Sequence, residues 1–152
     1  MTWTSNTVVL KLYEAVDTTH QFDGQRFDQW LDALRRRPIE EVGRALLGVF
    51  ENTARTRTRY LDQQYAGSLL LALRPPCFSD VGVLIRRLLP TWDLSVEQLP
   101  WYFDEVLGRE TLLQALATLA GQALSEEEQK ALETFHFWLR ARHPDNTPIL
   151  GE

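Results

Sequence analysis

The residues of this chain best suited to chemistry near neutral pH are its three histidines and its single cysteine. His20 and Asp23 lie in one predicted turn, where a histidine and a carboxylate could exchange protons as general acid and base. Turns commonly contain these residue types for structural reasons, and no nucleophile or oxyanion-binding group lies nearby in the sequence. We therefore interpret this pair as a turn motif, and an enzyme that uses His20 or His136 is kept as an alternative.

The spacing of the remaining candidates does not favour metal binding or thiol chemistry. His136 and His143 are separated by about 10.5 Å along a helix that rises 1.5 Å per residue, which is too far for one metal ion. Cys77 follows two prolines and has no sequence neighbour that would lower the pKa of its thiol. The chain contains no glycine-rich phosphate loop, no nucleophile elbow and no His-Glu-x-x-His motif. We predict a protein that is not an enzyme and needs no metal or other cofactor.

Arginines at alternate positions are the best candidates for binding nucleic-acid phosphates: Arg55, Arg57 and Arg59. In an extended segment they would share one edge at a spacing of about 6.6–7 Å. In a helix, Glu51 would reach Arg55 and Asp62 would reach Arg59, so much of the positive charge would be neutralised. The chain has a formal charge of −5 and no recognition-helix signature. Nucleic-acid binding is therefore an alternative and not the favoured function.

Acidic residues are concentrated in the second part of the chain. Residues 1–90 carry 12 Lys and Arg against 10 Asp and Glu, whereas residues 91–152 carry 4 against 11, so their formal charges are +2 and −7. An acidic surface repels the phosphates of nucleic acids and membranes and attracts basic proteins. The charge distribution thus predicts a basic protein as the partner.

Apolar residues recur at helical spacing almost throughout the chain, and no stretch alternates for long enough to predict a strand. We predict an all-α fold of about eight short amphipathic helices packed as antiparallel pairs. Ile39, Val42 and Leu46 are expected to face the core from the third of these helices. The last helix should begin at a capping box formed by Ser125 and Glu128. The predicted ranges are about 6–17, 27–35, 38–50, 60–73, 80–89, 100–107, 109–120 and 125–143.

Domain organisation and location follow from the same patterns. Residues 1–143 are predicted to form one helical domain, and Pro144 is expected to end the last helix and begin a flexible tail over residues 144–152. The longest apolar run, residues 69–73, is far shorter than the roughly 20 residues of a membrane span. The N-terminus lacks the pattern of a signal peptide, and a single cysteine fits a reducing compartment. A cytoplasmic protein without a membrane anchor is expected.

Aromatic and acidic residues lie close together in a pattern typical of protein interfaces. The three aromatic residues 101–103 are followed by carboxylates, and further carboxylates begin the last predicted helix. Rings would supply contact area and carboxylates would steer a basic partner. The rings could instead belong to the core, and the glutamates could serve only to complement a helix N-terminus. The candidate partner-binding residues are Trp101, Tyr102, Asp104, Glu105, Glu110, Glu126 and Glu127.

The segment LPWYFDEVLGRE at residues 99–110, together with the two helices that follow, resembles a degenerate HEAT-like helix pair. The same region, about a third of the chain, is similar in style to small bacterial immunity proteins that neutralise polymorphic toxins. This resemblance implies a cytoplasmic protein that covers the basic active surface of a cognate toxin, of the nuclease or deaminase class. A helical regulatory adaptor, with residues 55–59 touching nucleic acid, is the alternative.

Overall fold

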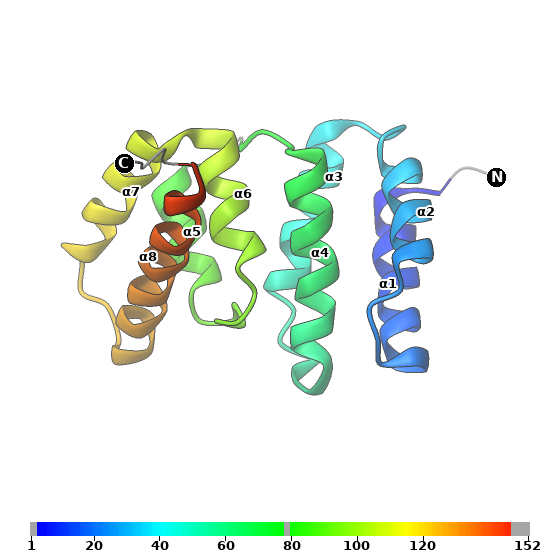
Figure 1. Ribbon diagram of the computed structural model, residues 1–152. Coiled ribbons are helices and arrows are strands. Elements are labelled where there is room, and N and C mark those ends of the chain that lie inside the picture. The colour runs from blue at the N-terminus through cyan, green and yellow to red at the C-terminus, as the bar shows by residue number, and fades with distance from the viewer. Residues whose placement is uncertain (1–2, 78–79, 147–152) are drawn as a thin grey trace.

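The structure is a computed structural model that describes residues 3–77 and 80–146, with side chains described as far as residue 142. Within these residues the chain forms eight α-helices, one short 3-10 helix and no strand, which confirms the predicted all-α class (Figure 1). None of the described helices is both long and apolar enough to cross a lipid bilayer. The elements are α1 (Ser5–Thr19), α2 (Gly24–Leu34), α3 (Ile39–Phe50), the 3-10 helix η1 (Thr56–Thr58), α4 (Arg59–Leu73), α5 (Val81–Leu88), α6 (Gln98–Leu107), α7 (Arg109–Ala120) and α8 (Glu126–Asn146).

Consecutive helices run in opposite directions and form an extended array (Figure 1). Helix α1 contacts α3, and α5 contacts α7, whereas α2, α4, α6 and α8 contact one another in that order. The odd-numbered helices therefore form one layer and the even-numbered helices form the other. Stacking of this kind is typical of helical repeats, and the HEAT-like assignment stays a prediction.

One continuous core lies between the two layers and receives side chains from all eight helices. Its largest fully buried residues include Phe50 and Tyr65 in the first half of the array and Phe103 and Phe135 in the second. Ile39 was predicted to be buried, and it is 40% exposed. The reason is its place as the first residue of α3, so it lies at the open end of the helix although the helical spacing puts it on the core side.

The predicted capping box is confirmed at the start of α8. The backbone N–H of Ser125 donates to Glu128 Oε1 at 2.9 Å, and Ser125 Oγ accepts from the Glu128 N–H at 3.0 Å. The end of this helix differs from the prediction, because α8 continues through Pro144 to Asn146. A proline lacks an N–H and crowds the carbonyl four residues earlier, so it disfavours the helix, but here it comes only two residues before the end of a 21-residue helix. The rest of the predicted tail, residues 147–152, lies outside the described residues.

Two buried polar side chains of the central helix α4 hold turns that lie far away in the sequence. The backbone N–H of Asp23 donates to the hydroxyl of Tyr65 at 2.6 Å. Gln63 donates from Nε2 to the carbonyl of Thr91 at 2.8 Å and accepts from the N–H of Asp93 at 2.6 Å. The turn between α1 and α2 and the segment between α5 and α6 are therefore both fixed relative to α4.

Glu41 on α3 fastens the start of α1 to the array. Its Oε2 accepts from the backbone N–H of Ser5 at 3.0 Å and from the Ser5 hydroxyl at 2.6 Å, and Ser5 is fully buried. Arg37 donates two further hydrogen bonds to the same carboxylate, each at 3.0 Å. The bonds from Arg37, followed by those from Ser5, lower the pKa of Glu41 from 4.5 to about 2 because they favour the ionised form.

We expect the attachment of α1 to weaken in acid. The pKa of Glu41 is lower in the folded state than in the unfolded state, so its stabilising contribution is fully present above pH 4.5 and is lost as the pH falls toward 2. Glu41→Gln should lower the urea midpoint at neutral pH and flatten its dependence on pH over this window, whereas Glu14→Gln, at an exposed position on α1, should follow the wild-type profile. An acid profile unchanged in Glu41→Gln would contradict this role.

Candidate protein-binding surface

The residues predicted to bind a partner lie near the two opposite ends of helix α7 and do not form one patch. Asp104 and Glu105 lie in the last turn of α6, close to Glu110 at the start of α7. Glu126 and Glu127 begin α8, beyond the other end of α7 (Figure 1). Because α7 has 12 residues, its two ends are separated by about 18 Å at 1.5 Å per residue.

Tyr102 belongs to the core and not to the surface. Its side chain is fully buried and its hydroxyl donates to the carbonyl of Pro75, and burial raises the pKa of this phenol. Trp101 is half-buried: its Nε1–H donates to the carbonyl of Trp138 at 3.0 Å, and the Arg142 guanidinium lies 5.7 Å from its ring centroid. Of the adjacent pair predicted to meet a partner, only Trp101 can present part of its ring.

Asp104 and Glu105 are held in ion pairs within the protein. Asp104 accepts two hydrogen bonds from Arg109, at 2.9 and 3.0 Å, and these bonds raise the pKa of Arg109. Glu105 accepts from Arg142 at 2.8 Å and lies 3.0 Å from a guanidinium nitrogen of Arg74. These contacts join α6 to α7, to α8 and to the end of α4. The two carboxylates are therefore compensated by neighbouring cations and contribute little to steering a partner.

The outer face of α8 carries an aromatic residue that the prediction did not include. Phe137 is 51% exposed, whereas Phe135 and Leu139 are each 1% exposed. A helix turns by about 100° per residue, so residues two apart point to opposite sides. Phe137 also packs edge-on against Trp138, with ring centroids 5.1 Å apart. The same spacing that identified the inward positions of this helix could have identified Phe137 as outward.

Exposed carboxylates lie on the same helix. Glu133, one turn before the exposed phenylalanine, and Glu126, nearer the start of α8, are both exposed, as is Glu127. Glu128 instead pairs with Arg86 of α5 at 3.4 Å. The acidic and aromatic combination predicted for α6 is thus found in accessible form on α8.

The arginine-rich segment presents less charge to phosphates than its sequence indicates. The Arg55 side chain is 19% exposed, and its guanidinium lies 2.9 Å from Asp62 and 2.9 Å from Asp17. Arg57 lies within η1 and is exposed, and Arg59 is the first residue of α4 and is half-buried. The segment is therefore not the extended edge that would place three free cations along a phosphate backbone.

The residues considered for catalysis have structural roles or lie far apart. His20 ends α1 in a left-handed conformation with φ of 55°, and the Asp23 carboxylate caps α2 by accepting from two backbone N–H groups. Burial, and secondly the charge of Arg140, lowers the pKa of the half-buried His136. The side chain of His143 lies outside the described residues. In the described part of the chain, no three His, Cys, Asp or Glu residues are grouped so that they could hold a metal ion.

Comparison of the chain with models of protein families, with curated proteins and with solved structures finds no match. The features of this chain that bear on its function are the geometry of the α8 face and the charge distribution of the chain.

Proposed function

We propose that this chain is a protein-binding module, a bacterial immunity protein that neutralises a cognate toxin by covering its basic active surface. The observation that carries this proposal is the outer face of α8, where the exposed Phe137 follows Glu133 by one turn and three exposed carboxylates outnumber two exposed cations. The toxin is a nuclease or a deaminase that acts on nucleic acid, because such an enzyme needs cations to hold phosphates. Inhibition occurs by occlusion in the cytoplasm and needs no cofactor.

The α8 face combines the two features that give a protein interface its affinity and its rate of formation. Aromatic residues are enriched at interfaces, where a few large side chains supply most of the binding energy. A partner that covers Phe137 would remove its exposed ring from water, which is favourable in proportion to the apolar area buried. The surrounding carboxylates would act mainly on the association rate.

The charge of the chain supports a basic partner. Residues 91–152 have a formal charge of −7, and ion pairs in the described structure compensate three of their carboxylates, those of Asp104, Glu105 and Glu128. On α8 the exposed carboxylates of Glu126, Glu127 and Glu133 outnumber the exposed cations of the same helix, Lys130 and Arg140. Attraction through this excess of negative charge should weaken with added salt, because the screening length is about 8 Å at physiological ionic strength.

The test is the rate at which a basic nuclease or deaminase domain encoded beside this chain associates with it. The double change Glu126→Lys and Glu133→Lys should slow association about tenfold at low salt. The matched control, Glu14→Lys and Asp28→Lys, makes the same change in net charge at exposed positions of α1 and α2 and should slow it much less. Circular dichroism must show an intact fold, because Glu126 lies in the first turn of α8, where negative charge is favourable.

Two results would count against the proposal in different ways. Equal effects of the two double variants, or association that becomes faster with salt, would show that the α8 carboxylates do not steer the partner. Failure of the wild-type chain to bind and inhibit the neighbouring toxin domain would refute the function itself.

A further inference from the structure

Helix α5 forms a ridge with a groove on each side, on the layer opposite α8. The first groove lies between α3 and α5 and is lined in part by Arg87, and the second lies between α5 and α7 and is lined in part by Arg86. Val83 lies between these two arginines on the outward side of α5 and is 63% exposed. An aliphatic side chain therefore stands at the crest of the ridge.

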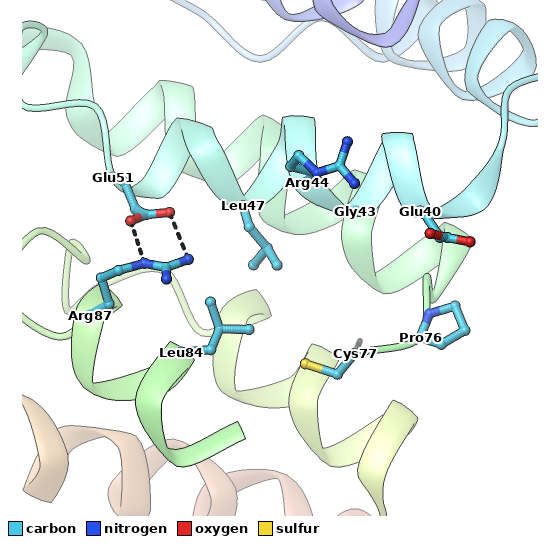
Figure 2. A pocket seen from close by; sticks show the side chains of 9 residues that line it. All are labelled: Glu40, Gly43, Arg44, Leu47, Glu51, Pro76, Cys77, Leu84 and Arg87. Atoms are coloured by element: carbon cyan, nitrogen blue, oxygen red, sulfur yellow. Dashed lines mark hydrogen bonds and ion pairs between the residues drawn. The ribbon is translucent and has the colours of Figure 1, made fainter. Parts of the chain in front are cut away.

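The groove between α3 and α5 has a volume of about 150 Å³ (Figure 2). Leu47 of α3 and Leu84 of α5 point toward each other across it, and Cys77 lies toward one end. At the other end, Glu51 and Arg87 form an ion pair with an oxygen to nitrogen distance of 2.7 Å. Apolar side chains lie at the middle of the groove and charged side chains border it, and a volume of this size can hold a group about the size of benzene. The groove can therefore accept one aliphatic side chain.

We propose that a second copy of this chain docks on this layer about a two-fold axis, with Val83 of each copy inserted into the α3–α5 groove of the other. A ridge beside a groove is self-complementary, because a half-turn rotation places the ridge of one copy over the groove of its partner. Val83 fits the volume of the groove, and its neighbour Gly82 has no side chain to hold the two helices apart.

The charges around the groove favour a contact between identical surfaces. The groove is bordered by two carboxylates and two guanidinium groups, those of Glu40, Glu51, Arg44 and Arg87. In a two-fold interface each surface patch meets its own copy. A patch with equal numbers of positive and negative side chains can therefore place opposite charges together, whereas a patch with charges of one sign repels its copy. The proposed toxin-binding face of α8 carries more exposed carboxylates than cations. It belongs to the other layer, so the dimer leaves the proposed toxin-binding surface accessible.

Analytical ultracentrifugation of the full chain tests the proposal. The wild-type protein should sediment with twice the mass of one chain and should dissociate on dilution. Val83→Glu should be monomeric where the wild type is dimeric, because the new carboxylate would be buried against Leu47 and Leu84 without a partner. Val83→Ile should remain dimeric. The control Tyr60→Glu places a carboxylate on α4, in the other layer, at a residue that is 46% exposed, and should also remain dimeric.

Three results would overturn the dimer: a wild-type chain that is monomeric at every concentration tested, a Val83→Glu variant that still dimerises, or a mass that grows beyond two chains. The last result would indicate a head-to-tail contact instead of a two-fold one. The outcome is independent of the proposed function, because Val83→Glu should associate with the toxin domain at the wild-type rate.

Discussion

Replacing Arg55 with methionine is expected to lower the free energy of unfolding by about 3–5 kcal/mol, because the change leaves a buried carboxylate without its cation. The side chain of Asp62 is only 4% exposed, and Arg55 donates to it from Nε at 2.9 Å and from a second guanidinium nitrogen at 3.1 Å. Arg55 also pairs with Asp17 of α1 at 2.9 Å, and its guanidinium lies 4.2 Å from the ring centroid of Tyr13. One side chain thus joins α1 to α4, and its loss should reduce the melting temperature by roughly 10 °C.

Urea denaturation followed by circular dichroism measures this effect. Arg57→Met is the matched control, because Arg57 is exposed two positions away, and it should change stability by no more than about 0.5 kcal/mol. Adding Asp62→Leu to Arg55→Met should restore part of the lost stability, since both buried charges are then removed. Equal stability of the two single arginine variants would show that the Arg55–Asp62 pair contributes nothing measurable.

The helices could be predicted because their signals are local. The spacing of Val42, Leu46 and Val49 marks the buried side of α3 without any knowledge of its neighbours, and all three are buried. The capping box of Ser125 and Glu128 likewise needs only four consecutive residues. Burial at a helix end is less local, because it depends on how far the neighbouring helices extend, which explains the exposure of Ile39.

The ion pairs could not be predicted because most join residues far apart in the sequence. Glu51 would have reached Arg55 only if the segment were helical, but α3 ends at Phe50 and Glu51 pairs with Arg87 of α5. Arg55 is then oriented by the turn and by η1 toward Asp62. Helical spacing identifies ion pairs between residues three or four positions apart, and it cannot identify them where the helix ends between the two residues.

The partner-binding residues on α6 were difficult to assign for a related reason. Three consecutive aromatic residues on a helix point in three directions, and the sequence alone does not show which of them faces solvent. Tyr102 and Phe103 enter the core, and Trp101 is half-buried. Glu105 lies in an acidic run in the sequence, yet its charge is met by Arg142, a residue of α8. The packing of the helices buries or pairs the candidate residues of α6 and leaves the acidic and aromatic residues of α8 exposed, and this packing is not visible in the sequence.

Phe137→Ala is expected to weaken binding of the toxin domain by about 2–4 kcal/mol, which corresponds to a rise of roughly 30- to 1000-fold in Kd. Phe137 is the large apolar side chain of the proposed surface that is most accessible, and it is supported from one side by Trp138. The rigid ring can therefore enter a pocket of the partner at a small cost in conformational entropy. Most of the effect should be on the dissociation rate, because the steering carboxylates are left in place.

Isothermal titration calorimetry and surface plasmon resonance with the purified toxin domain measure this prediction. Tyr60→Ala is the matched control: Tyr60 is an aromatic residue of α4 that is 46% exposed, close to the 51% of Phe137, but it lies outside the α8 face. Loss of the edge-on contact with Trp138 should cost Phe137→Ala no more than about 1.5 kcal/mol of folding stability, so the variant should remain folded. If the two alanine variants bind equally well, Phe137 is not an anchor of the interface and the partner must bind elsewhere on the array.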